Sequence, residues 1–413
     1  MKRKKGTLVI SILAVILISL TSFGCLDESV LVEISRCLFI NYKIDYAIDK
    51  LDYLDAQMAL AYDYPVFEIE KKIYSFTENN GRVLKTLVWY PKNKTDKSPV
   101  VLFSHGFSNS GESQLYLLKG LARRGNIVIA PDHLDIVNFD HIGLFDKQKN
   151  STLSSTDLIG VIDYVILNMI RNEAANYIRY FNLSEEEIEF LADSGELFNR
   201  FNILFNYRIN DINFLLEKLT ELNASDATFK GKIDFNRLVL GGHSLGGYAV
   251  IKRVFTQHPF KALFCLSPDL EPFNQNDLAK INVPVLYMTG DLDHFHDDIA
   301  WAFDNTAVPK VFQSILDGGH NIFTDRPFLY GLGIPFISGG ETGFTDNLPF
   351  DKERGNSNYC YPEQLKDYQG KALTILKSVS AFVDFYVSGN ENGLEILNDM
   401  QNDYFISQEI IEE

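Results

Sequence analysis

The chain has 413 residues, of which 46% are hydrophobic and 23% are charged, a balance typical of globular proteins with a substantial core. Its formal net charge of -17 at pH 7 excludes the basic surface that nucleic acids require and disfavours adsorption to anionic lipid headgroups by charge alone. We therefore expect no nucleic-acid partner, and either one large domain with insertions or two smaller ones.

The N-terminus has the layout of a secretory signal. "MKRKKG" is basic, and residues 7–24 form an uncharged apolar run that ends at Cys25. The junction before Cys25 resembles the cleavage site of a bacterial lipoprotein, although Ser22 stands where a leucine is usual. An uncleaved membrane anchor is the alternative, because the run is just long enough to span a bilayer. Residues 1–24 therefore predict a lipid-anchored, membrane-anchored or secreted protein outside the cytoplasm.

The four cysteines fit that compartment without defining a bridge. Residues 25–65 predict an N-terminal extension that carries Cys37. If Cys25 is lipidated, three thiols remain, and these cannot all pair within one chain. A bridge between Cys37 and Cys360 is chemically allowed in an oxidising compartment, with Cys265 left over. No cysteine spacing matches a zinc motif.

The next segments predict strands that flank a helix. Residues 66–76 and 82–91 are separated by the turn-like "NNG" and predict an antiparallel hairpin. The apolar runs 98–106 and 126–135 bracket a helical stretch at 114–125. Two strands around a helix indicate a βαβ unit and hence parallel pairing.

The same alternation resumes after an interruption at residues 150–208. Ile212, Leu215 and Leu219 lie on one face of a predicted helix, and four more strand runs follow, at 237–244, 261–269, 283–291 and 310–320. The pattern predicts an α/β fold: a mostly parallel sheet of roughly eight strands with helices on both faces. Ligands are expected beyond the carboxyl ends of the strands.

The interruption at residues 150–208 predicts a helical insert. It is rich in isoleucine, phenylalanine and tyrosine, and "SEEE" at 184–187 fits a capping box. Because it follows a strand's carboxyl end, it can cover the ligand site as a lid; helices that only enlarge the core are the alternative. We place the domain at residues 66–390, closed by a helix at 371–387, and predict a C-terminal tail at 391–413.

The stretch "VLGGHSLGGYAV" at 239–250 holds the clearest chemical signal. Gly242-x-Ser244-x-Gly246 lies between a predicted strand and a predicted helix. A serine hydroxyl is a poor nucleophile until a base takes its proton and fixed donors receive the charge on the attacked carbonyl. Flanking glycines suit a strained, tightly packed turn. An ordinary serine in a glycine-rich loop is the alternative, but this context favours a nucleophile at Ser244.

An acid and a histidine should follow the serine in chain order. His320 comes after two glycines at the end of the last predicted strand, and we predict that it accepts the serine proton. Asp293, beyond the preceding strand, is predicted to orient and stabilise the imidazole. Asp291 is close by, and Asp269, after the strand before, is the alternative acid.

Two backbone N–H groups should bind the oxyanion. We predict those of Leu245, directly after the serine, and Phe107, after the strand "VVLFSHG". "DLDHFHDD" concentrates acids and histidines, but its spacing matches no standard ligand pattern, so we expect no metal and no cofactor. His133, in "PDHLD", is predicted to be structural, with a substrate contact as the alternative.

These motifs resemble the α/β-hydrolase superfamily, and within it the plasma-type platelet-activating-factor acetylhydrolase and predicted dienelactone hydrolase family. The similar stretches are "VVLFSHGFSNS", "NIVIAPDHLD", "INDINFLLEKL", "GGHSLGGYAV", "VPVLYMTGDLD" and "DGGHNIF", between about residues 66 and 325 without the insert. "PDHLD" departs from the corresponding acetylhydrolase element. In the acetylhydrolases the acid lies where residues 267–269 stand here; in the dienelactone-like relatives it lies at Asp293.

The resemblance implies a serine carboxylic-ester hydrolase that forms an acyl-enzyme and acts on a small or lipid-like ester. A phospholipase like the platelet-activating-factor acetylhydrolases is the alternative within the enzyme class. From a different class, a lipoprotein binding module can keep this fold without turnover.

Overall fold

The computed structural model describes only part of the chain: residues 66–79, 81, 83–106, 109–133, 196–270, 273–307, 309–325, 362–400 and 405–411. The predicted signal or anchor, the extension and most of the insert lie outside these ranges, as do Cys25, Cys37 and Cys360. Cys265 is described and is a free, buried thiol. Within the described ranges, no helix is both long enough and apolar enough to cross a bilayer.

One sheet of nine strands organises the described residues, in the order β1-β2-β4-β3-β5-β6-β7-β8-β9. Strands β3 to β8 pair in parallel, whereas β1, β2 and β9 add antiparallel pairs at the two edges. The strands are β1 (Ile69–Thr77), β2 (Val83–Pro91), β3 (Ser98–Ser104), β4 (Ile127–Pro131), β5 (Ile233–His243), β6 (Ala262–Leu266), β7 (Val285–Gly290), β8 (Lys310–Ile315) and β9 (Phe405–Ile411). The predicted hairpin and the predicted parallel strands are both confirmed.

The burial of each strand explains its sequence. Every residue of β3, β4, β6, β7 and β8 is buried, so these strands are continuous apolar runs, as parallel strands covered on both faces must be. Strand β1, at the sheet edge, instead alternates exposed and half-buried side chains along most of its length.

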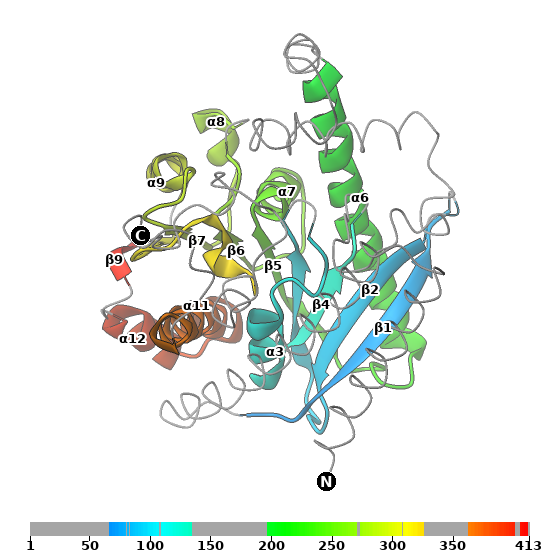
Figure 1. Ribbon diagram of the computed structural model, residues 1–413. Helices are drawn as coiled ribbons and strands as arrows, with labels where there is room; N and C mark the ends of the chain where they lie inside the picture. The colour runs from blue at the N-terminus through cyan, green and yellow to red at the C-terminus, as the bar shows by residue number, and fades with distance from the viewer. Residues whose placement is uncertain are drawn as a thin grey trace, which may run out of the picture.

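Helices cover both faces of the sheet (Figure 1). Helices α3 (Leu115–Arg123), α11 (Pro362–Ser388) and α12 (Asn392–Asp399) pack on one face and enclose one apolar core. Helices α6 (Glu196–Ser225), α7 (Leu245–Arg253), α8 (Gln275–Leu278) and α9 (His296–Asn305) lie over the other face, around a second core. The predicted α/β architecture is confirmed.

Residues 391–413, predicted as a C-terminal tail, include α12 and the ninth strand. Strand β9 pairs antiparallel with β8, and Gln313 Nε2 donates to Gln408 Oε1 at 2.7 Å across the pair. The sheet therefore continues beyond residue 390. Local sequence does not show this, because the partner of an edge strand lies far away in the chain.

Residue 208, the predicted end of the insert, lies inside α6, a single helix from Glu196 to Ser225. The apolar spacing that revealed this helix begins only where it packs on the sheet. Figure 1 shows the N-terminal part of α6 extending beyond the sheet, where no neighbouring strand imposes that spacing.

Candidate active site

Ser244 sits on the turn that joins β5 to α7. Its backbone has φ 53 and ψ -123, a conformation that non-glycine residues rarely adopt. The turn is held from both sides: the Ser244 N–H donates to the Leu266 carbonyl at 3.0 Å, and the Ser244 carbonyl accepts from the Tyr248 N–H at 3.0 Å. The side chain is half-buried. The structure thus presents this hydroxyl at the carboxyl edge of the sheet.

The glycines on either side of Ser244 are required by close backbone contacts. A Cβ added at Gly242 would overlap the carbonyl of Gly246, and a Cβ added at Gly246 would overlap the carbonyl of Ser104 at the end of β3. Neither obstacle is a side chain that could turn away. The motif that singled out Ser244 therefore has a direct packing reason.

Asp293 and His320 meet at the ends of β7 and β8. His320, the first residue of the 3₁₀ helix η1 (His320–Phe323), has its Nδ1 at 3.2 Å from Oδ2 and 3.3 Å from Oδ1 of Asp293. Both side chains are buried. Asp269, the alternative acid, lies in the loop after β6, where its N–H donates to the Ser244 carbonyl at 3.4 Å. The carboxylate that the structure pairs with His320 is that of Asp293.

The surroundings of Asp293 keep it ionised. Burial raises the pKa of this carboxyl, but the charge of His320 and hydrogen bonding from His320 and Ser267 outweigh it, and the pKa falls to about 2. An ionised Asp293 accepts the Nδ1–H of His320 and leaves Nε2 as the basic nitrogen of the ring.

His243, the residue between Gly242 and Ser244, links the serine turn to the His320 loop. Its Nε2 donates to the His320 carbonyl at 3.0 Å, and its Nδ1 accepts from Gln114 Nε2 at 3.4 Å. The ring is buried. The sequence analysis assigned His243 no role, because the motif allows any residue at this position. Its contact with the His320 carbonyl is seen only in the folded structure.

Ser267 is a second residue that sequence reasoning missed. It follows β6 directly, is fully buried and has φ 42. Its N–H donates to the Met288 carbonyl at 2.8 Å, which ties β6 to β7 beside Asp293. A serine near the end of a predicted strand carries no signal for such a role.

Of the two predicted oxyanion donors, the structure describes Leu245 but not Phe107. Leu245 is buried and is the first residue of α7, so its N–H points out of a helix N-terminus, where the helix dipole favours negative charge. Phe107 lies outside the described residues, although Gly106 before it is described. A Cβ added at Gly106 would come within 2.8 Å of His243 Nδ1, which places the end of this segment against the serine turn.

The candidate metal ligands fall in the same place. Ligand atoms of Asp293, His294 and His320 lie within 4.8 Å of one another, so a cation bound there would compete with the contact between Asp293 and His320. His133 is 2% exposed, and its ring contacts Ser104 and Asp211 inside the protein, which agrees with its predicted structural role.

A serine on a strained turn after a parallel strand, with a histidine supplied from a later strand end, is characteristic of α/β hydrolases, and the fold places the chain in that class. The comparisons are more specific. The family model described as "Platelet-activating factor acetylhydrolase, isoform II" matches residues 72–335, and the chain belongs to this family.

A curated relative is the platelet-activating factor acetylhydrolase of Cavia porcellus. It is 24% identical over an alignment of 273 residues, and the match covers 61% of this chain and 56% of the relative. The chain therefore spans a little more than half the length of that relative. The family resemblance inferred from the motifs is confirmed, and it makes the protein a member of a hydrolase family.

Proposed function

We propose that the protein is a serine carboxylic-ester hydrolase that works through an acyl-enzyme. Ser244 is the nucleophile, His320 the general base and then acid, and Asp293 the carboxylate that orients His320. The observation that carries the proposal is the geometry at the sheet edge: a strained, half-buried serine, and a buried Asp293–His320 pair tied to the serine turn by His243.

In the proposed acylation step, these groups act in turn. His320 Nε2 takes the hydroxyl proton as Ser244 Oγ attacks the carbonyl carbon of the ester. The oxyanion that forms is received by the N–H groups of Leu245 and Phe107. The ester C–O bond then breaks, and His320 protonates the leaving alcohol. Water repeats the sequence on the acyl-enzyme, releasing the acid and restoring Ser244.

Asp293 acts through its charge and its hydrogen bonds. With a pKa of about 2 it stays ionised, so it can hold the Nδ1–H tautomer of His320 and stabilise the imidazolium in both halves of the reaction. The proposed reaction uses no cofactor and no metal.

The family supports a small or lipid-like ester as substrate. An activity like that of the platelet-activating factor acetylhydrolases, on a phospholipid with a short acyl group, is the second candidate, favoured by the match over residues 72–335. Residues 1–24 and a lipidated Cys25 would hold the enzyme at a membrane outside the cytoplasm, and the insert at residues 150–208 would serve as a lid over the ester. These two roles are proposed from the sequence alone.

A fluorophosphonate probe tests the nucleophile. We expect one covalent adduct, mapped by peptide mass spectrometry to Ser244 and absent in Ser244→Ala. No adduct in the folded protein would overturn the proposal and favour the binding-module alternative. Turnover of p-nitrophenyl esters from two to sixteen carbons, run beside an oxidised phospholipid, then separates the candidates. Hydrolysis of the phospholipid favours the acetylhydrolase-like activity, and hydrolysis of the short esters alone favours the general esterase.

A further inference from the structure

A second group of serine, histidine and aspartate side chains lies inside the protein, on a strand end that packs against the serine turn. Ser104 Oγ is 2.8 Å from His133 Nε2, and His133 Nδ1 is 2.7 Å from Asp211 Oδ2. The residues come from the end of β3, the segment after β4 and helix α6. All three are buried, and the side chains of His133 and Asp211 are 0% exposed. This serine lies in a strand that solvent does not reach, so the network is no second nucleophilic site.

Arg208 donates hydrogen bonds to this cluster and to the backbone beside it. It is 1% exposed and lies three residues before Asp211, so the two side chains share one face of α6. Its Nη1 donates to Ser104 Oγ at 3.1 Å and to the His105 carbonyl, and its Nη2 donates to the Gly106 carbonyl at 3.2 Å.

A guanidinium can only donate, so Ser104 Oγ accepts a hydrogen bond from Arg208. Ser104 Oγ also contacts His133 Nε2, and His133 Nδ1 contacts the carboxyl of Asp211. The buried guanidinium of Arg208 and the buried carboxyl of Asp211 are thus connected through Ser104 and His133.

The Gly106 carbonyl receives a second donor. His105 Nδ1 is 2.7 Å from this oxygen, and His105 Nε2 accepts from the His133 N–H at 3.1 Å. Peptide groups are planar and almost always trans, so the C=O and the N–H of one group point in opposite directions. Donors that orient the Gly106 carbonyl therefore orient the N–H of the same peptide group, which is the second oxyanion donor of the proposed mechanism.

The segment that Arg208 holds also touches the serine turn. A Cβ at Gly246 would overlap the carbonyls of Ser104 and His105 or press against them, because α7 begins directly against this strand end. A shift of these carbonyls would therefore move either the oxyanion donor or the first turn of α7.

From this geometry we infer that Arg208 is a positioning residue for ester hydrolysis, which binds the carbonyls of His105 and Gly106 and so aims and polarises the peptide N–H that stabilises the oxyanion. The inference rests on the proposed function. Its chemical reason is the planar fork of arginine, which can bond three acceptors at once, whereas a lysine ammonium acts as a single compact charge.

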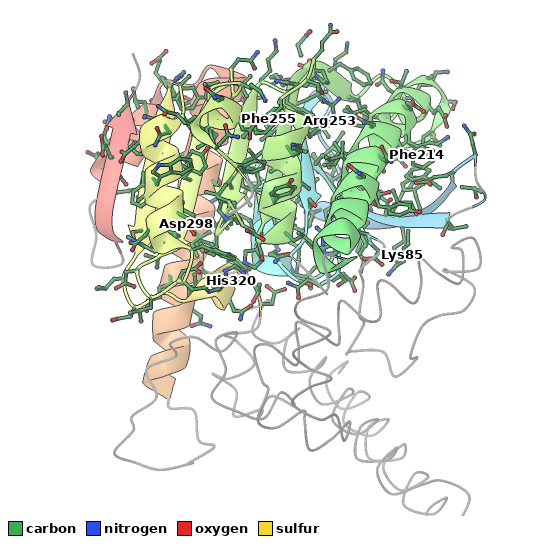
Figure 2. All side chains as sticks on the ribbon, turned by 90° about the horizontal axis from the view of Figure 1, so that it is seen from above. Lys85, Phe214, Arg253, Phe255, Asp298 and His320 are labelled. Carbon is green, nitrogen blue, oxygen red and sulfur yellow. The ribbon has the colours of Figure 1, made fainter. Side chains whose placement is uncertain are left out.

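The test is Arg208→Lys, with Arg253→Lys as the matched control. Arg253 is a partly buried arginine at the other end of α7, where its Nε donates to Asn213 Oδ1 at 2.6 Å. Figure 2 shows it at the end of the sheet opposite to His320. For Arg208→Lys, removal of oxyanion stabilisation predicts a fall in kcat of about 10²-fold with KM changed less than about threefold. The control should keep kcat within about threefold.

A ratio of two substrates separates positioning from loss of folded enzyme. An oxygen ester forms an oxyanion, whereas the matching thionoester places the developing charge on sulfur, which bonds poorly to N–H donors. The ratio of kcat/KM for the oxygen ester to kcat/KM for the thionoester does not depend on the fraction of active enzyme. We expect it to fall by about tenfold or more in Arg208→Lys and to be unchanged in Arg253→Lys and Asp293→Asn.

The outcomes distinguish this inference from the proposed function. Wild-type protein that hydrolyses neither ester and takes no phosphonate adduct defeats the proposed function. Active wild-type protein whose substrate ratio is unchanged in Arg208→Lys defeats the inference about Arg208 alone. If Arg208→Lys does not fold, Ser104→Ala replaces it: removing one of the three acceptors of the guanidinium should lower the same ratio about threefold, and an unchanged ratio would overturn the inference.

Discussion

Replacing Asp293 by asparagine removes the charge that faces His320 while keeping the shape of the side chain. The pKa of Asp293 is about 2, against an ordinary value of 3.8, and the group is buried. At about 1.4 kcal/mol per pKa unit, the ionised form stabilises the folded state by about 2 kcal/mol near neutral pH. The pKa is depressed in the folded state, so this stabilisation is complete above about pH 4 to 5 and is lost as pH falls toward 2.

Urea unfolding of wild type and Asp293→Asn at pH 6 and pH 3 measures this term. The difference in the free energy of unfolding between the two proteins should shrink by about 1 kcal/mol, because about half of the stabilisation is lost by pH 3. A difference that stays the same at both pH values would refute the linkage between Asp293 and His320.

The same variant should have little activity. An asparagine cannot stabilise the imidazolium, and its amide can hold the wrong tautomer of His320, so we expect a loss in kcat of about 10⁴-fold by analogy with other serine hydrolases. Asp269→Asn is the matched control, expected to stay within about threefold of wild type. The reverse result, with activity lost in Asp269→Asn and kept in Asp293→Asn, would show that the acid is misassigned.

Three further changes test the architecture around the site. Gly246→Ala should prevent a well-folded turn, because the added Cβ overlaps the Ser104 carbonyl; a soluble variant with wild-type thermal stability and phosphonate labelling would contradict that packing. His243→Leu removes the donor to the His320 carbonyl and should lower kcat about tenfold at constant KM in steady-state assays, whereas unchanged kcat would show that the His320 loop needs no such tie. Truncation of residues 401–413 removes β9 and exposes the edge of β8, so we expect a lower melting temperature and aggregation on heating, which scanning calorimetry and light scattering would detect.

The sequence predicts the central fold well because its strands are buried on both faces. Strands such as β3 and β7 are short, continuous apolar runs separated by helical stretches, and this pattern has few other interpretations. The serine turn is equally visible, since Gly242 and Gly246 are dictated by local backbone contacts. Features that depend on neighbouring residues are thus available from the sequence.

Features that depend on distances across the fold cannot be read from the sequence. Asp269 and Asp293 both follow strands that end at the same sheet edge, so their sequence positions are equivalent and only the distance to His320 separates them. Arg208 is harder still. A charged residue on a helix normally faces water, and its burial depends on carbonyl groups of a segment far earlier in the chain.

Ser104 and Ser244 show how differently the fold can present two serines at neighbouring strand ends. Ser104 and Ser244 both lie at ends of neighbouring parallel strands, but Ser104 stays in its strand, buried and bonded by Arg208. Ser244 has left its strand at positive φ, one of three non-glycine residues among those the structure describes to do so; the others, Ser267 and Asp317, follow β6 and β8. Such conformations cost about 1–3 kcal/mol each and persist only where the surroundings enforce them. The strain therefore gathers at one edge of the sheet, in the turns that follow β5, β6 and β8, whereas Ser104 ends its strand without positive φ.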